Sequence, residues 1–341
     1  MKILTTMGAY DAAKDIYMYG KHSKPNGSYL TLQDLATSTS RDMVPQYKDF
    51  RSYFDDDNYA DTIITKVMEQ TFPFNDASLD QRAEIVVKVL SVMVLYMQVL
   101  QELYEAQSDC EAGVQTRSLD GASAWDKAAA YIIGSIETSH NGGSRWFEDG
   151  QLLYGLAKQR CIQFGTCDKT TGNADVNEEL IELFYAGQSE AKTFTCNALR
   201  RTIGSIQPLL LTPLIQSTLR AAIENEDLTF FSTEVTLADG YVYSSSILPL
   251  IKAVDATAAH SIKKNMDFQF TVVPVMDGAG AVFSAMEAGI IEMKSVDCSD
   301  IGSIQSMDVC GGSKRSSATP IAKISIISTM ACFLVSIIFM K

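Results

Sequence analysis

The longest apolar pattern of the chain runs from residue 79 to 107 and predicts a helix inside the protein. Apolar side chains occur on nearly all of its sides, so neighbouring helices have to cover it. Asp76 and Ser78 precede it as candidate N-caps, and the stretch from Cys110 to Gly113 is expected to end it. Three polar residues interrupt it too often for a bilayer span, namely Lys88, Gln98 and Glu102. We therefore expect the central helix of a bundle.

Helical periodicity continues through most of the remaining sequence. Further helices are expected at 9–20, 30–36, 45–53, 59–71, 124–138, 150–164, 177–186, 188–205, 207–225, 240–263 and 280–294. The β-branched runs at 230–236 and 268–275 are short and indicate extended connections. The sequence thus predicts an all-α fold, a multi-helix bundle.

Length and charge restrict the function. With 341 residues, 46% of them hydrophobic, the chain can bury one large core or two modest ones. Its formal net charge of −13 argues against nucleic acid as a partner, because the phosphate backbone would be repelled. The sequence has no nucleophile elbow, metalloprotease His pair or phosphate-binding loop. We therefore expect a binding or structural protein rather than an enzyme.

A faint internal repeat indicates two related helical halves. Residues 12–20 read AAKDIYMYG and residues 126–134 read DKAAAYIIG, so both have Tyr-x-x-Gly after an alanine-bearing helix. The repeat predicts an N-terminal helical half over 1–110 and a second helical region over 124–310. The alternative is that alanine-rich helices ending in glycine simply look alike.

The C-terminal tail predicts membrane attachment. Residues 324–340 carry no charge, and as a helix they would span about 25 Å, enough to cross a hydrocarbon core. A polar linker at 311–323 precedes them. Two interpretations stay open: a transmembrane anchor, or a glycolipid-anchor signal that is removed, which the small residues at 311–313 fit.

Cysteine usage favours an extracellular body. Six of the seven cysteines precede the tail, and an even number is typical of an oxidising compartment. The expected near-neighbour disulfides are Cys161 with Cys167 and Cys298 with Cys310. Asn26 lies in a glycosylation acceptor, Asn-Gly-Ser. No secretory signal is visible and basic residues flank the tail, which would fit a cytosolic tail-anchored protein. We favour an extracellular body whose start is truncated in this sequence.

Two neighbouring segments resemble a known family. Residues 124–137 read AWDKAAAYIIGSIE, and residues 150–167 read GQLLYGLAKQRCIQFGTC. They resemble two helices of the algal Fe-assimilating proteins and the diatom iron-starvation-induced phytotransferrins, densely at 124–167 and loosely over 9–310. The resemblance implies ferric-iron binding at the cell surface in high-affinity uptake, together with carbonate. It also implies hand-off to a reductase, a permease or the endocytic machinery.

Hard oxygen donors are the expected ligands, because Fe(III) prefers phenolate and carboxylate, sometimes with histidine. The two resembling helices offer Asp126, Tyr131, Glu137 and Tyr154, with Asp126 and Glu137 on one stripe, three turns apart. The predicted helix 240–263, preceded by a loop with Asp239, adds Tyr241, Tyr243, Asp255 and His260. Arg160 is the candidate for holding the anion.

Each candidate ligand also has an ordinary structural explanation. The tyrosines would pack at the edge of the core, the acids would cap helices or face solvent, and the histidine would be exposed. The alternative function is accordingly a membrane-anchored helical surface or structural protein without metal.

Overall fold

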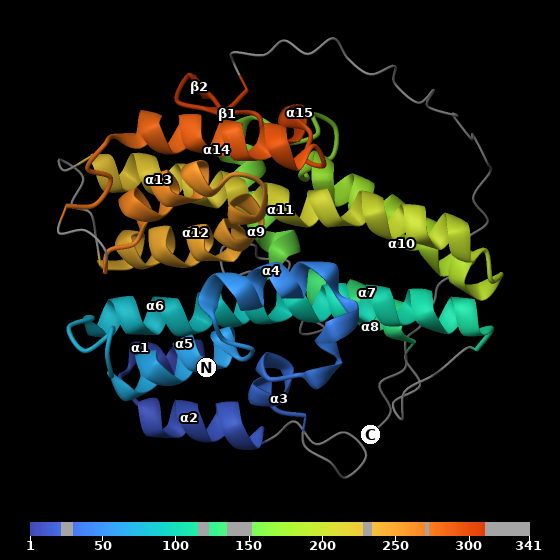
Figure 1. Ribbon diagram of the computed structural model, residues 1–341, viewed down its shortest axis with the longest axis horizontal. Coiled ribbons are helices and arrows are strands. Elements are labelled where there is room, and N and C mark those ends of the chain that lie inside the picture. The colour runs from blue at the N-terminus through green and yellow to red at the C-terminus, as the bar shows by residue number, and fades with distance from the viewer. Residues whose placement is uncertain (22–29, 115–122, 135–151, 228–233, 270–272, 311–341) are drawn as a thin grey trace. The chain divides into compact units, whose positions relative to one another are not determined.

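The computed structural model describes residues 1–21, 30–114, 123–134, 152–227, 234–269 and 273–310. Residues 1–309 form one compact unit made almost entirely of helices (Figure 1). The predicted all-α class is therefore confirmed for this part of the chain. The predicted linker at 311–323, the anchor at 324–340 and Asn26 lie outside the described residues. The division into two related halves stays a prediction.

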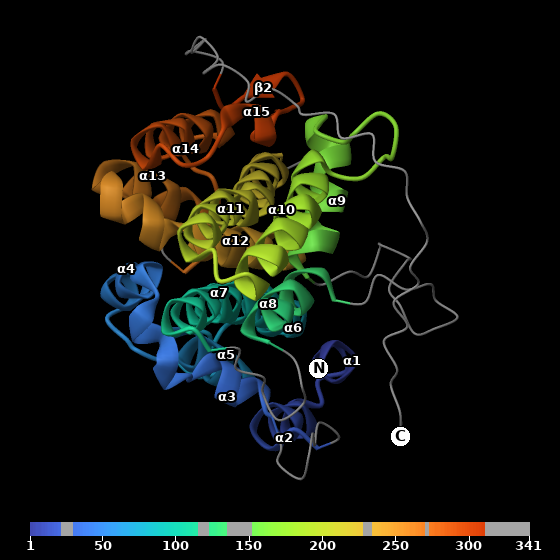
Figure 2. The same ribbon diagram turned by 90° about the vertical axis from the view of Figure 1, so that its right-hand side faces the viewer.

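The helices lie in two layers, which Figures 1 and 2 show from perpendicular directions. The N-terminal layer contains α1 (Lys2–Thr6), α2 (Tyr10–Tyr19), α3 (Leu32–Ala36), a 3₁₀ turn (Thr39–Met43), α4 (Pro45–Phe54), α5 (Tyr59–Glu69), α6 (Leu79–Val89), a π-helical turn (Leu90–Val94), α7 (Leu95–Ala112) and α8 (Ala124–Ile133). The C-terminal layer contains α9 (Leu153–Phe164), α10 (Asp175–Lys192), α11 (Cys196–Glu226), α12 (Glu234–Val254), α13 (Ala256–Met266), α14 (Ala279–Met293), α15 (Cys298–Ile301) and the hairpin β1 (Ser303–Ile304) and β2 (Met307–Asp308).

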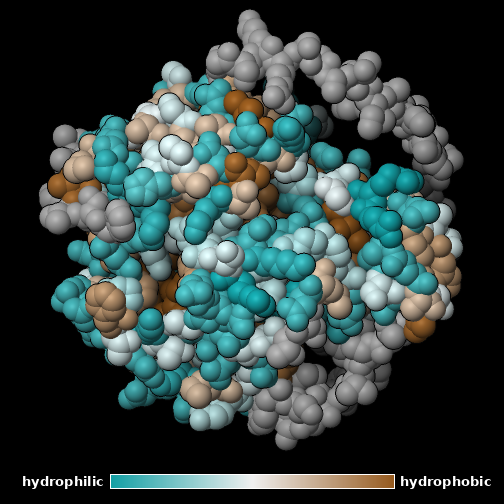
Figure 3. All heavy atoms as spheres, in the orientation of Figure 1, coloured by the Kyte–Doolittle hydropathy of each residue, from teal (hydrophilic) through white to brown (hydrophobic). Residues whose placement is uncertain are grey.

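The predicted central helix is confirmed as the continuous rod α6–π turn–α7. Ser78 caps it in a reciprocal capping box with Gln81, and Gly113 ends it in the left-handed conformation with φ of 68°. This rod is the one helix among the described residues that is long and apolar enough to cross a membrane. Most of it is buried, however, because α1, α5, α8, α11 and α12 pack around it. Figure 3 shows that the surface in this view is mostly hydrophilic, with small hydrophobic patches.

Helix α11 corrects the sequence prediction, which placed separate helices at 188–205 and 207–225. The structure has a single helix of 31 residues that continues through Pro208 and Pro213. Each proline removes one backbone hydrogen bond and disfavours the helix by about 3 kcal/mol in isolation. Packing against α10 and α12 on either side stabilises the continuous helix here.

The segment predicted as one helix over 240–263 is also different. Helix α12 begins at Glu234, inside the run 230–236 for which an extended connection was expected, and it places Asp239 within a helix rather than in a loop. It ends before Asp255, whose extended backbone separates α12 from α13. The side chain of Asp255 accepts hydrogen bonds from the N–H groups of Thr257 and Ala258, which caps α13.

Disulfide bonds lie at the ends of several helices. The predicted bond Cys161–Cys167 is confirmed and closes the C-terminal end of α9. A second bond, Cys110–Cys196, joins the end of α7 to the start of α11 with 5.6 Å between the two Cα atoms, and it was not predicted. Cys298 and Cys310 are disulfide-bonded as well, as the sequence prediction requires.

Helix α8 is held on α10 by Trp125. Its indole N–H donates to the carbonyl oxygen of Phe184 at 2.9 Å, and the two rings lie 5.4 Å apart between centroids. Gly187 lies one turn further on, and a Cβ atom there would come within 2.0 Å of the indole. A residue without a side chain is therefore required where these helices cross.

Gly187→Ala should lower the free energy of unfolding by about 3 kcal/mol, because the new methyl group overlaps the indole and forces the helices apart. Gly204 is the matched control: it is also helical, but a Cβ atom there would have no neighbour within 4 Å. Gly204→Ala should stabilise the protein by about 0.5–1 kcal/mol. Urea unfolding measures both changes, and equal effects would contradict the packing described for Gly187.

Candidate functional site

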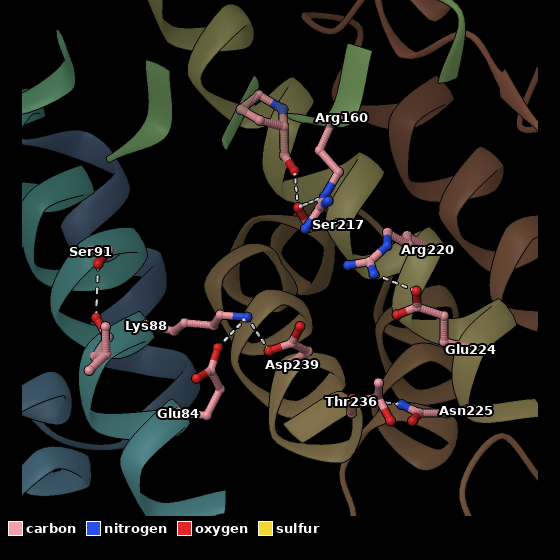
Figure 4. Close-up of polar contacts among 12 residues, drawn as sticks. Glu84, Lys88, Ser91, Arg160, Ser217, Arg220, Glu224, Asn225, Thr236 and Asp239 are labelled. Atoms are coloured by element: carbon pink, nitrogen blue, oxygen red, sulfur yellow. Dashed lines mark hydrogen bonds and ion pairs between the residues drawn. The ribbon is translucent and has the colours of Figure 1, made fainter. Parts of the chain in front are cut away.

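A polar cavity lies where α6, α9, α11 and α12 meet, and we call it the four-helix pocket (Figure 4). Its volume is about 170 Å³. The ionisable residues that line it are Lys2 from α1, Glu84 and Lys88 from α6, Arg160 from α9, Arg220 from α11, and Asp239 and Tyr243 from α12. On each helix that contributes two of them, the residues are four positions apart and share one face. Charged groups from distant parts of the chain thus converge here.

Lys88 joins the two acids of the pocket. Its ammonium lies 2.7 Å from a carboxylate oxygen of Glu84 and pairs with Asp239 on α12. Only 13% of the Lys88 side chain and 8% of the Asp239 side chain are exposed. Burial alone would lower the pKa of Lys88, but Tyr243, Asp239 and Glu84 outweigh it and raise that pKa above its ordinary value. Lys88 is therefore charged and held by both carboxylates.

Arg160 is fixed by hydrogen bonds to neutral groups. Its Nε–H donates to Ser217 Oγ at 2.8 Å, and its Nη1–H donates to Gln163 Oε1 at 2.9 Å. Ser217 in turn donates to the carbonyl oxygen of Pro213 (Figure 4). Burial lowers the pKa of the Arg160 guanidinium and Tyr243 opposes this, yet an arginine remains charged. Among the described residues the guanidinium of Arg160 therefore lines the pocket without a direct ion pair to a carboxylate, and Asp239 favours its charge from a distance.

Arg220 marks the border between the pocket and a second cavity. It pairs with Glu224 one turn along α11 at 2.5 Å. The second cavity, of about 270 Å³, is lined by both residues and by Gln163, Ile304 and Gln305. Burial raises the pKa of Glu224, and Arg220 opposes that shift. The guanidinium groups of Arg160 and Arg220 thus both face the four-helix pocket, the second with a carboxylate beside it.

The π-helical turn of the central rod forms another wall of the pocket. Ser91 and Val92 line the cavity, and Ser91 Oγ donates to the carbonyl oxygen of Val87 at 2.8 Å. Such turns are energetically unfavourable relative to a regular helix and occur frequently at functional sites. The position of this π-helical turn beside the charged residues supports the four-helix pocket as the candidate functional site.

Two of the residues predicted from the sequence meet in the pocket, Tyr243 and Arg160. The Arg160 guanidinium carbon lies 5.9 Å from the centre of the Tyr243 ring, and Lys88 Nζ lies 4.8 Å from the same ring. Tyr241, two residues earlier on α12, points about 200° away around the helix. It packs edge-on against Phe74 and Phe268. The two tyrosines therefore do not share a site.

The predicted residues on the resembling helices lie elsewhere. Asp126 is exposed, belongs to the capping box of Ser123 and accepts a hydrogen bond from Gln188. Helix α8 ends at Gly134, so the stripe expected to join Asp126 to Glu137 on one helix is interrupted, and Glu137 itself lies outside the described residues. Tyr131 is half-buried on α8.

Tyr154, Asp255 and His260 are also placed apart from the pocket. The Tyr154 hydroxyl accepts a hydrogen bond from Asn173 at 2.9 Å. Asp255 caps α13, and His260 is exposed on that helix. Within the described part of the chain, no three His, Cys, Asp or Glu side chains gather closely enough to hold a metal ion by themselves. A metal site in the four-helix pocket would need the phenol of Tyr243 and a ligand from outside the protein.

Sequence reasoning missed Glu84, Lys88, Arg220 and Asp239. One signal was present: Lys88 is a charged residue inside the mainly apolar run of the central helix, and a buried charge requires a partner. Nothing in the sequence identified Asp239 as that partner, because the two residues are 151 positions apart. Comparisons of the chain with protein-family models, with curated proteins and with solved structures found no match.

The buried pairing of Lys88 makes a testable contribution to stability. Lys88→Met should lower the free energy of unfolding by about 3 kcal/mol, because it leaves Asp239 charged and buried without its counter-ion. The double variant Lys88→Met/Asp239→Leu should recover much of this loss, since neither charge remains. Chemical unfolding of the four proteins of this double-mutant cycle measures the coupling. Additive effects would contradict a direct interaction between these two side chains.

Proposed function

We propose that the chain binds a ferric ion together with a small oxyanion such as carbonate in the four-helix pocket. The observation that carries the proposal is the convergence of one phenol, two carboxylates and two guanidinium groups on one cavity. Tyr243, Asp239 and Glu84 supply the hard oxygen donors that Fe(III) prefers. Arg160 and Arg220 supply the charge and the hydrogen-bond donors that an oxyanion requires. The resemblance of residues 124–167 to iron-binding algal proteins supports the same ligand.

The charges around the pocket support an anion bound beside the cation. Two acids line the cavity, Glu84 and Asp239, against four bases, Lys2, Lys88, Arg160 and Arg220, the last of which also pairs with Glu224. A ferric ion alone would leave a large uncompensated charge at a half-buried place, which is unfavourable. A ferric ion, a carbonate dianion and the phenolate of Tyr243 together add no net charge. The oxyanion would complete the coordination that the protein donors leave open.

The two tyrosines of α12 provide the decisive test. Titration of the full chain with Fe(III) and bicarbonate, in mild detergent, should produce a visible phenolate-to-iron charge-transfer band. Tyr243→Phe should abolish the band, whereas Tyr241→Phe should keep it, because Tyr241 is also buried but faces the opposite side of the helix. Omission of bicarbonate should weaken binding.

Two outcomes would contradict the proposal. A wild-type protein that stays colourless and releases no calorimetric heat with iron would leave the alternative of an anchored helical surface protein without metal. A band that survives Tyr243→Phe and is lost with Tyr131→Phe or Tyr154→Phe would move the iron to another site.

The proposal places iron capture at the cell surface, ahead of uptake through a reductase, a permease or the endocytic machinery. The three pairs of cysteines and the acceptor at Asn26 support an extracellular body. In the native host, glycosidase treatment should increase the gel mobility of the wild-type protein and leave Asn26→Gln unchanged. Identical mobility of both proteins without any shift would favour a cytosolic body.

A further inference from the structure

The lining of the four-helix pocket carries more positive than negative charge. Two carboxylates, Glu84 and Asp239, lie against four basic side chains, Lys2, Lys88, Arg160 and Arg220. The ammonium of Lys88 pairs with both carboxylates. The acids of the cavity are therefore engaged with one base, and three further cationic groups, from α1, α9 and α11, line the same space.

The two guanidinium groups of the pocket are close enough to repel each other. Figure 4 shows that Arg160 and Arg220 point toward the same space from two different helices. Burial and the charge of Arg220 lower the pKa of Arg160, and Tyr243 opposes both. Glu224 offsets part of the charge, but it pairs with Arg220 alone. Two like charges at a partly buried place are unfavourable unless an anion lies beside them.

Arg160 is fixed in place without being neutralised. Only 4% of the residue is exposed, and its guanidinium donates hydrogen bonds to Ser217 and Gln163, which are both neutral. Its planar fork of N–H groups matches two oxygens of a carboxylate or a phosphate. A charged group held in one orientation binds such an oxyanion without first losing conformational freedom.

Size and charge indicate which oxyanion fits. The cavity of about 170 Å³ is smaller than the pockets of drug-sized ligands, which have about 300–1,000 Å³. Four bases against two acids leave an excess of two positive charges in the lining, part of which Glu224 offsets from the border. A phosphate group carries a charge of about −1.5 to −2 at pH 7, together with several acceptor oxygens, whereas a carboxylate carries one negative charge. Phosphate therefore balances the lining better.

We infer that the four-helix pocket binds a phosphate group, either the free ion or a small phosphate monoester, without any metal. Arg160 and Arg220 hold the phosphate oxygens, and Lys2 adds a third positive charge from the exposed side. Lys88 stays with Glu84 and Asp239 and keeps their negative charges from repelling the ligand. This inference goes beyond the proposed function because it does not need iron.

Phosphate binding can be measured on the full chain in mild detergent, after a chelating resin has removed metal ions. Inorganic phosphate and glycerol 3-phosphate are titrated in separate arms at an ionic strength kept constant with chloride. Each bound anion should raise the melting temperature and saturate, because it binds the folded chain alone. Tighter binding of glycerol 3-phosphate would identify an ester as the ligand, and tighter binding of inorganic phosphate would identify the free ion. No rise with either anion would overturn the inference.

A pair of arginine variants on α11 tests the place of binding. Arg220→Gln should weaken phosphate binding about tenfold, because the ligand loses a charge-assisted contact. Arg201→Gln is the matched control, since Arg201 is exposed on the same helix and the net charge changes equally. It should keep the affinity of the wild type. Equal weakening in both variants would indicate a general charge effect and refute a site in the pocket.

A measurement on the wild type covers the case in which Arg220→Gln does not fold. The side chain of Arg220 is 27% exposed, so an arginine-specific dicarbonyl reagent can reach it. Saturating phosphate should slow the modification of Arg220 several-fold, as followed by mass spectrometry, and leave Arg201 unaffected. Unchanged modification of Arg220 would overturn the inference.

The outcomes for phosphate and for iron are independent of each other. Phosphate binding by a protein that stays colourless with iron would support the inference and refute the proposed function. A charge-transfer band from Tyr243 without any effect of phosphate would refute the inference and leave the proposed function in place.

Discussion

The buried ion pair between Lys88 on α6 and Asp239 on α12 connects the two layers of the protein, and Glu84, one turn from Lys88 on α6, pairs with the same ammonium. The central rod has to be wrapped on all sides because it is apolar nearly all round, and α12 provides one of the covering surfaces. A charge within such an interface is tolerated only when it is paired. The residues at the facing positions of α6 and α12 therefore have to carry opposite charges. Helices α9 and α11 pack around them and complete the pocket.

The pocket combines features that a purely structural cluster does not need. Two guanidinium groups face it, one of them held by neutral partners, and a phenol lies within reach of both a lysine and an arginine. The π-helical turn beside the pocket interrupts the regular α-helical geometry of the central rod. An interface built for stability alone would more readily be filled with apolar side chains of similar volume. This contrast is the physical argument for a binding site.

Several expectations about the site depended on helix boundaries and changed with them. The expected stripe from Asp126 to Glu137 required a helix beyond Gly134, where α8 ends. The expected grouping of Tyr243 with Asp255 and His260 required one straight helix, whereas the chain breaks at Asp255. A capping aspartate and a terminating glycine are short-range signals, but each also occurs within helices and loops. Their effect depends on which alternative the neighbouring helices stabilise.

The sequence alone determined the helical class, the buried central rod with a cap at Asp76 or Ser78 and an end between Cys110 and Gly113, and the bond Cys161–Cys167. These features depend on periodicity and on residues close together in the chain, where local physical chemistry is sufficient. Only the tertiary structure decided that Lys88 meets Asp239, that Tyr243 rather than Tyr241 faces Arg160, and that α11 continues through two prolines. Pairings between distant residues and the face that a helix buries are set by packing, which periodicity cannot specify when nearly all sides of a helix are apolar.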